Sequence, residues 1–248
     1  MTTHILEPEA QQIADATSQP PFLYQLGPDA ARKVLDDLQA APVEKVSVAE
    51  DRWRTVPAEV GDVRVRLLKP EGVTGPLPVI LYVHGGGWIL GNSGTHDRLA
   101  RELADGARAA LAFVEYDRSP EAQYPVAIEQ AYATARWITA EGAAEGLDPG
   151  RMAVAGDSVG GNMAAALAIL AKQRGDVRFV HQSLYYPVTD AGQDTPSYRE
   201  FADGPFLTAA NMAWFWDAYL PDTARRAEIT ASPLRASLDE LAGLPPAS

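Results

Sequence analysis

One serine stands where a catalytic nucleophile would be expected. The segment 156–160 reads GDSVG, with Ser158 at its centre; a short apolar run, 152–155, precedes it, and an Ala- and Leu-rich helical run, 162–172, follows it. Strand, sharp glycine turn and helix in that order lift a serine hydroxyl to the top of a sheet. The backbone N–H of Val159 then faces the same spot from a helix N-terminus. The pattern predicts a nucleophile, although glycine and serine are also ordinary turn residues.

A second glycine-rich stretch, HGGGW at residues 84–88, follows the continuous apolar run 77–83. Three glycines after a buried strand cost backbone entropy, so a need for bare backbone explains them better than a flexible turn does. Together with the serine downstream, they indicate an oxyanion loop, whose N–H groups would stabilise negative charge on a substrate oxygen. His84 lies on the oxyanion side, and we expect it to fix the loop rather than act as a base.

The elements that must position these residues alternate between strands and helices. Buried strands are expected at 77–83, 109–116, 152–155 and 179–188, and helices at 28–39, 95–104, 162–172 and after Pro125. Two half-exposed antiparallel strands are expected at 43–56 and 62–68, joined by a turn at 61–62. Ser93 or Thr95 is expected to cap the helix at 95–104. The continuous apolar run at 77–83 is what a strand covered on both faces requires.

Residues 189–230 depart from this alternation and are rich in aromatic side chains. Positions 212, 215, 216 and 219 share one helical face. Such a face suits either ordinary packing or a hydrophobic lid over a substrate pocket. We favour the lid, because segments at strand ends carry specificity. The N-terminal arm contains a possible short helix within 4–16, and the 28–39 helix places Ala31, Val34, Leu35 and Leu38 on one face; we interpret it as a covering arm.

Composition limits the classes of function. The 248 residues include no cysteine, which excludes disulfides and thiolate metal sites, and 46% are hydrophobic, enough for a substantial core. A net charge of −12 argues against binding nucleic acid or anionic lipid. Residues 1–16 lack the pattern of a signal peptide, and no apolar run reaches the length of a membrane span. We therefore expect a soluble cytoplasmic protein.

Taken together, these motifs resemble the hormone-sensitive-lipase branch of the α/β-hydrolase esterases. HGGGW at 84–88 and GDSVGG at 156–161 match that branch's HGGGW and GDSxGG, and YDRSPE at 116–121 looks like a variant of its YRLAPE block. The resemblance implies the α/β class and an α/β-hydrolase fold, with a mostly parallel central sheet flanked by helices and a two-part helical cap. The implied division is a first cap part at 1–45, a core at 46–189, a second cap part at 190–230 and the start of an incomplete C-terminal core at 231–248.

The resemblance also implies hydrolysis of small carboxylic esters with short or medium acyl groups, without a metal or cofactor. Ser158 would be the nucleophile, and Gly86, Gly87 and Val159 would supply the oxyanion N–H groups. One donor of that kind contributes roughly 3 kcal/mol in the transition state. A deacetylase of an acetylated small molecule, a non-catalytic ligand binder on the same scaffold and a non-functional fragment are the alternatives.

A serine triad also needs an acid and a histidine, which follow the serine in that order in this fold. The histidines are His4, His84, His96 and His181, and none is placed for the role: His96 is expected at a helix start and His181 at the wrong end of its strand. The resemblance therefore predicts a truncated chain, in which 241–247 leads into the strand that would carry the acid. The strand at 179–188 would then be an uncovered edge through which the chain could form oligomers.

Overall fold

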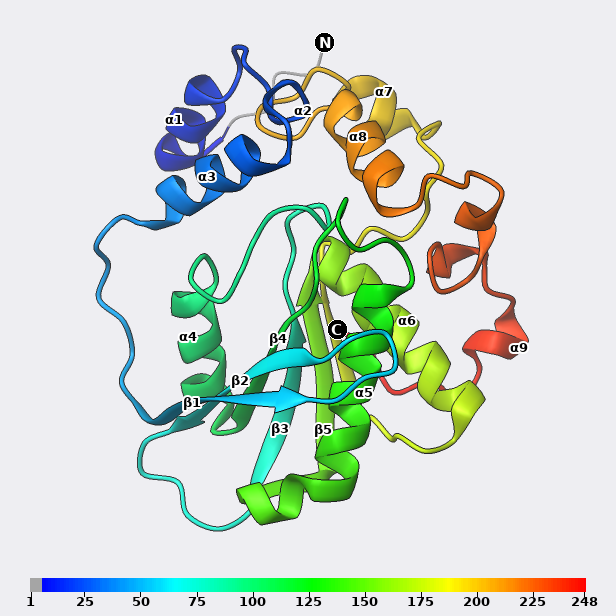
Figure 1. Cartoon of the computed structure of the whole chain (residues 1–248). Coiled ribbons are helices and arrows are strands. Elements are labelled where there is room, and N and C mark those ends of the chain that lie inside the picture. The colour runs from blue at the N-terminus through cyan, green and yellow to red at the C-terminus, as the bar shows by residue number, and fades with distance from the viewer. Residues whose placement is uncertain (1–5) are drawn as a thin grey trace.

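The computed structural model describes residues 6–248, so His4 lies outside the described residues. A six-stranded sheet forms the centre, in the order β1-β2-β4-β3-β5-β6 (Figure 1). The strands are β1 Val48–Val56, β2 Val63–Pro70, β3 Leu77–Val83, β4 Ala110–Glu115, β5 Leu147–Asp157 and β6 His181–Tyr185. β1 and β2 are antiparallel to their neighbours, whereas β3 to β6 are parallel to one another. The predicted mostly parallel sheet with an antiparallel edge is confirmed.

Three long helices cover the two faces of the sheet: α4 Asp97–Ala107, α5 Val126–Glu141 and α6 Val159–Arg174. α4 packs with Tyr82 and Phe113 in a small core on one face, and α5 and α6 pack into the larger core on the other. The apolar stripe of α5 is fully buried, as the i, i+3, i+4, i+7 spacing of its members leads one to expect. Its members are Ile128, Ala131, Tyr132, Ala135 and Ile138.

The two glycine-rich stretches meet because β3 and β5 are neighbours. In the parallel register Val83, the last residue of β3, lies opposite Gly156 near the end of β5. The loop after β3 and the turn after β5 therefore emerge at the same edge of the sheet. The carboxyl ends of parallel strands are where ligands bind in open α/β sheets.

Two segments far apart in the sequence lie together over this end of the sheet (Figure 1). One holds α1 Pro8–Ala16, α2 Leu23–Leu26 and α3 Pro28–Gln39, and the other α7 Pro196–Glu200 and α8 Ala209–Tyr219. They touch where the Tyr24 N–H donates to Asn211 Oδ1 at 3.1 Å. The predicted apolar face of α8 is buried, and α3 has the predicted bounds, although Leu38 is 50% exposed rather than packed. The division of the chain into four parts stays a prediction.

The start of α4 differs from the prediction. The helix begins at Asp97 and has His96 in the N-cap position, with no side-chain cap. The Thr95 hydroxyl instead bonds the backbone N–H and carbonyl of Asn92, both at 2.9 Å. Neither Ser93 nor Thr95 therefore caps the helix, because the residues before it form their own tight turn. The turn between the first two strands also comes earlier than predicted, with the Gly61 N–H donating to Ala58 O at 3.1 Å.

The predicted uncovered edge at β6 is partly wrong. Residues 245–248 run alongside β6, with a parallel bridge between Gln182 and Ala247. The Leu184 N–H donates to Ser248 O at 2.8 Å, and the Ser248 N–H donates to Gln182 O at 3.0 Å. The segment predicted to lead into a further strand thus pairs with this edge. The short helix α9 Leu238–Leu241 precedes this segment. Oligomer formation stays a prediction.

Candidate active site

Ser158 occupies the turn between β5 and α6 in an unusual backbone conformation. Its φ is 55° and its ψ is −118°. A positive φ in a non-glycine residue costs of order 1–3 kcal/mol and persists only where the surroundings impose it. Here the Ser158 N–H donates to Tyr185 O at 2.9 Å, and Ser158 O accepts from Asn162 and Val188 at 3.0 and 3.1 Å. The turn has the geometry of a nucleophile elbow.

The glycines around Ser158 are required by close packing. A Cβ at Gly156 would lie well under 3.0 Å from the Gly160 backbone, and one at Gly160 would lie well under 3.0 Å from Val83 O. A Cβ at Gly161 would be 3.0 Å from Pro187. Only glycine therefore lets α6 start this close to β3. This close packing explains why the turn around the serine is rich in glycine.

The loop after β3 takes its shape from glycines in the left-handed region. Gly86 has φ 111° and Gly87 has φ 62°. A Cβ at Gly87 would lie well under 3.0 Å from the ring of Phe215 in α8. The next residue, Trp88, is fully buried and stacks on Tyr219 of the same helix, with ring centroids 4.0 Å apart. The second cap segment therefore holds this loop in place.

Ser158 opens onto two cavities. One, of about 690 Å³, is lined mainly by residues between 186 and 212, among them Tyr198, Leu207 and Met212. The other, of about 510 Å³, brings Ser158 together with Gly86, Gly87 and Leu23 of the N-terminal arm. Val159, the remaining oxyanion candidate, follows Ser158 as the first residue of α6. Three of the four predicted site residues thus line one cavity, with the fourth directly adjacent.

His84 is part of the scaffold of the loop. Its ring is fully buried and stacks on Tyr116, with centroids 4.2 Å apart, and its Nδ1 is 2.8 Å from Gly85 O. Burial lowers the pKa of His84 to about 3, so the ring is neutral near pH 7. This agrees with the expected role in fixing the loop rather than taking a proton.

The other two described histidines, His96 and His181, are not placed to take the proton of Ser158. His181 pairs with Ala153, five residues before Ser158, which is roughly 16 Å along the strand. Its Nε2 is 3.0 Å from Ser248 Oγ. His96 directs its Nε2 to Asp157 Oδ2, 3.5 Å away. Within residues 6–248, no histidine is hydrogen-bonded to Ser158.

Asp157 is a functional candidate that the sequence reasoning missed. Its side chain is mostly buried, and Oδ1 accepts hydrogen bonds from the Gly85 N–H at 2.9 Å and the Tyr82 hydroxyl at 2.7 Å. Burial by itself raises the pKa of Asp157, but contacts with His96, Tyr82 and His84 outweigh it and lower the pKa below its usual range. The sequence does contain a signal for Asp157: a carboxylate within a buried turn needs hydrogen-bond donors nearby, so its position beside Ser158 points to partners in the site.

Residues 6–248 show neither a cluster of metal-binding side chains nor a helix that could span a membrane. Across residues 6–248, no three His, Asp or Glu side chains gather as metal ligands would. None of the helices described there combines the length and apolar character that crossing a bilayer requires.

Comparison with known proteins identifies the family. A model described as the alpha/beta hydrolase fold matches residues 80–248. The chain belongs to the α/β-hydrolase family. This hydrolase is 40% identical to the carboxylesterase NlhH of Mycobacterium tuberculosis over 226 residues, which are 89% of this chain and 70% of that protein. It is 38% identical to the esterase LipI of the same organism over 247 residues, covering 98% and 75% of the two chains.

Solved structures agree with this assignment. The hydrolase superposes on a thermostable esterase from Pseudomonas putida with a TM-score of 0.94 and 45% identity, covering 100% of this chain and 78% of that one. The predicted fold and membership of an esterase family are therefore confirmed. The roles of individual site residues stay predictions.

Proposed function

We propose that this hydrolase cleaves small-molecule carboxylic esters and that Ser158 Oγ attacks the ester carbonyl carbon. The observation that carries the proposal is the strained conformation of Ser158, at φ 55°, in a turn that opens onto both cavities. Strain of this kind clusters at functional sites. An ester extends on both sides of the attacked carbon, so two cavities that meet at Ser158 suit its acyl and alcohol parts.

The developing oxyanion would be stabilised by backbone N–H groups of Gly86, Gly87 and Val159. Gly86 and Gly87 line the cavity that Ser158 enters, and Val159 begins α6, where free N–H groups point out of the helix. Removing one such donor typically costs about 10²–10³ in turnover. These groups need no metal or cofactor to act.

The proton of Ser158 needs an acceptor, and residues 6–248 place no histidine there. Members of a serine triad act as a unit, and loss of an essential one costs on the order of 10⁶ in turnover. We therefore expect residues 1–248 alone to hydrolyse activated esters only slowly, through attack by a Ser158 hydroxyl whose proton no histidine takes up.

Hydrolysis of p-nitrophenyl acetate and butyrate by the purified chain tests the proposal. We expect release of p-nitrophenolate by the wild type to be abolished in Ser158→Ala and unchanged in Ser47→Ala, a control at an exposed hydroxyl. Equal rates in the wild type and Ser158→Ala would refute the proposal. Binding of the esters without any Ser158-dependent hydrolysis would favour a ligand binder instead.

A further inference from the structure

A histidine–carboxylate pair lies next to the start of the oxyanion loop. The imidazole of His96 is largely buried, with 14% of its side chain exposed, and its Nε2 is 3.5 Å from Asp157 Oδ2. On the other side of the ring, Nδ1 is 2.9 Å from Thr95 Oγ1. With Nδ1 turned toward Thr95, Nε2 is the ring nitrogen that faces the carboxylate, and a proton on Nε2 would be donated to Asp157.

The same carboxylate holds the start of the oxyanion loop. Asp157 Oδ1 accepts from the Gly85 N–H at 2.9 Å, and Gly85 directly precedes Gly86. The packing is tight, because a Cβ at Gly85 would lie well under 3.0 Å from Asp157 Oδ2. The position of this carboxylate therefore sets the path of the loop backbone.

The geometry points to His96 as a positioning residue for the oxyanion loop: it anchors the Asp157 carboxylate, which in turn holds the Gly85 N–H and so aims the Gly86 and Gly87 backbone at Ser158. The inference rests on the proposed function only where it takes the loop to stabilise an oxyanion. The contacts themselves form a continuous path from Thr95 to Gly85. An error of about 1 Å in catalytic geometry can cost on the order of 100-fold in rate.

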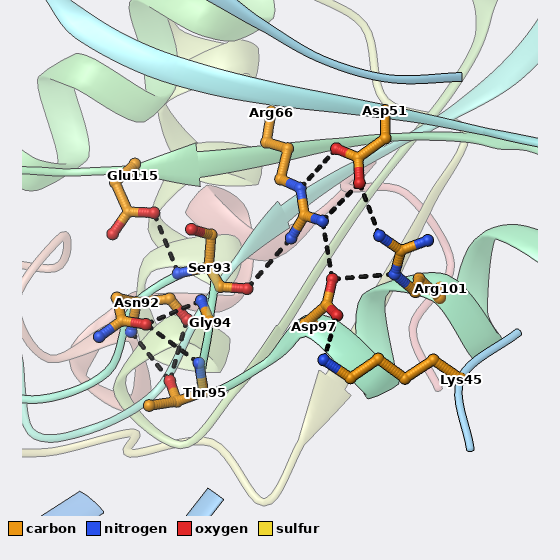
Figure 2. Close-up of polar contacts among 10 residues, drawn as sticks. All are labelled: Lys45, Asp51, Arg66, Asn92, Ser93, Gly94, Thr95, Asp97, Arg101 and Glu115. Carbon is orange, nitrogen blue, oxygen red and sulfur yellow. Dashed lines mark hydrogen bonds and ion pairs between the residues drawn. The ribbon is translucent and has the colours of Figure 1, made fainter. Parts of the chain in front are cut away.

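The segment that carries His96 is itself anchored by charges (Figure 2). Asp97, the next residue, forms ion pairs with Lys45 at 2.6 Å, Arg66 at 2.7 Å and Arg101 at 2.9 Å. Arg66 also donates to Ser93 O at 3.2 Å. Figure 2 shows the Asn92–Thr95 turn closing beside this cluster. His96 thus sits between a fixed turn and a fixed helix start, as positioning requires.

A role for His96 as the base for Ser158 does not fit its orientation. His96 and Ser158 line the same cavity, but the Nε2 atom faces Asp157 and Nδ1 faces Thr95. Both ring nitrogens are therefore occupied. The experiment must separate positioning from proton transfer, and an amide side chain does so, because it donates a hydrogen bond but takes no proton near pH 7.

Hydrogen exchange followed by mass spectrometry tests the positioning role in the whole chain, without any need for activity. We expect peptides covering residues 84–91 to exchange about tenfold faster in His96→Phe, because the Asp157 carboxylate that holds the Gly85 N–H loses the side chain that anchors it. His96→Gln should restore protection, and Asp105→Asn, elsewhere on α4, should leave it unchanged. Equal protection of the loop in wild type and His96→Phe would overturn the inference.

A measurement on the wild-type chain keeps the inference testable should His96→Phe misfold. Nitrogen-15 NMR of the histidine rings reports which nitrogen carries the proton. We expect Nε2 of His96 to be protonated. A bare Nε2 with the proton on Nδ1 would overturn the inference, because no donor would then face Asp157.

The rate at which a fluorophosphonate labels Ser158 links the inference to function. We expect His96→Phe to lower this rate at least tenfold and His96→Gln to restore most of it. Loss in both variants, with loop protection unchanged, would assign His96 to proton transfer and overturn the positioning role. Absence of labelling in the wild type would count against the proposed function, while the exchange experiment would still decide the role of His96.

Discussion

Gly87 should tolerate no side chain, because α8 already occupies the space of its Cβ. In Gly87→Ala the new methyl group would lie well under 3.0 Å from the Phe215 ring. The backbone at φ 62° adds a cost of about 1–2 kcal/mol for an L side chain, and overpacking costs about 1–3 kcal/mol. We expect Gly87→Ala to lower the free energy of unfolding by about 2–5 kcal/mol, the sum of these terms.

Urea unfolding of a double-mutant cycle separates the two terms. Phe215→Ala alone should cost about 3–5 kcal/mol, but in the double variant the clash is gone, so the combined loss should fall short of the sum by about 1–3 kcal/mol. Gly72→Ala is the matched control, with φ 66° and no atom within 4 Å of the added Cβ, so it should show the backbone cost alone. Additivity within about 0.5 kcal/mol would refute the claim that Phe215 sets the loop's shape.

Two further predictions concern the supports of the site. Asn162 is buried and its Nδ2 donates to Val188 O at 2.7 Å and Ala231 O at 2.8 Å; Asn162→Ala should lower the free energy of unfolding in urea by about 2–4 kcal/mol, because two carbonyls lose their donor, and a loss below about 0.5 kcal/mol would contradict this. The Arg32 side chain holds the pKa of Glu121 at about 2, below the ordinary 4.5. The stability from this pair is therefore present above pH 4.5 and lost as pH falls through 2. Melting temperatures of Glu121→Gln should depend less on pH across that interval, and an unchanged slope would count against the pairing.

Elements with strong local patterns could be predicted from the sequence. β3 Leu77–Val83 and α3 Pro28–Gln39 have the predicted bounds, since a continuous apolar run and a proline-initiated amphipathic run each determine their own structure. Ser158 and the glycine loop were identified because their function demands unusual residues at fixed spacing.

Features that depend on tertiary contacts could not be predicted in this way. His96 reads as a helix-start residue in the sequence, and only the packing of α4 against the sheet brings it to Asp157. Thr95 resembles a cap, but the Asn92 backbone competes for its hydroxyl. Likewise, no local pattern shows that residues 245–248 pair with β6.

The most direct test of the central claim is intact-mass spectrometry of the chain after reaction with a fluorophosphonate, followed by peptide mapping. The account predicts a single covalent adduct on Ser158 that forms slowly, because no described histidine takes up the serine proton. The adduct should be absent from Ser158→Ala and from chain unfolded in urea, because the elbow and the oxyanion loop must be assembled to direct the reaction. No adduct on the folded wild-type chain, or equal labelling of Ser158 in folded and unfolded protein, would contradict it.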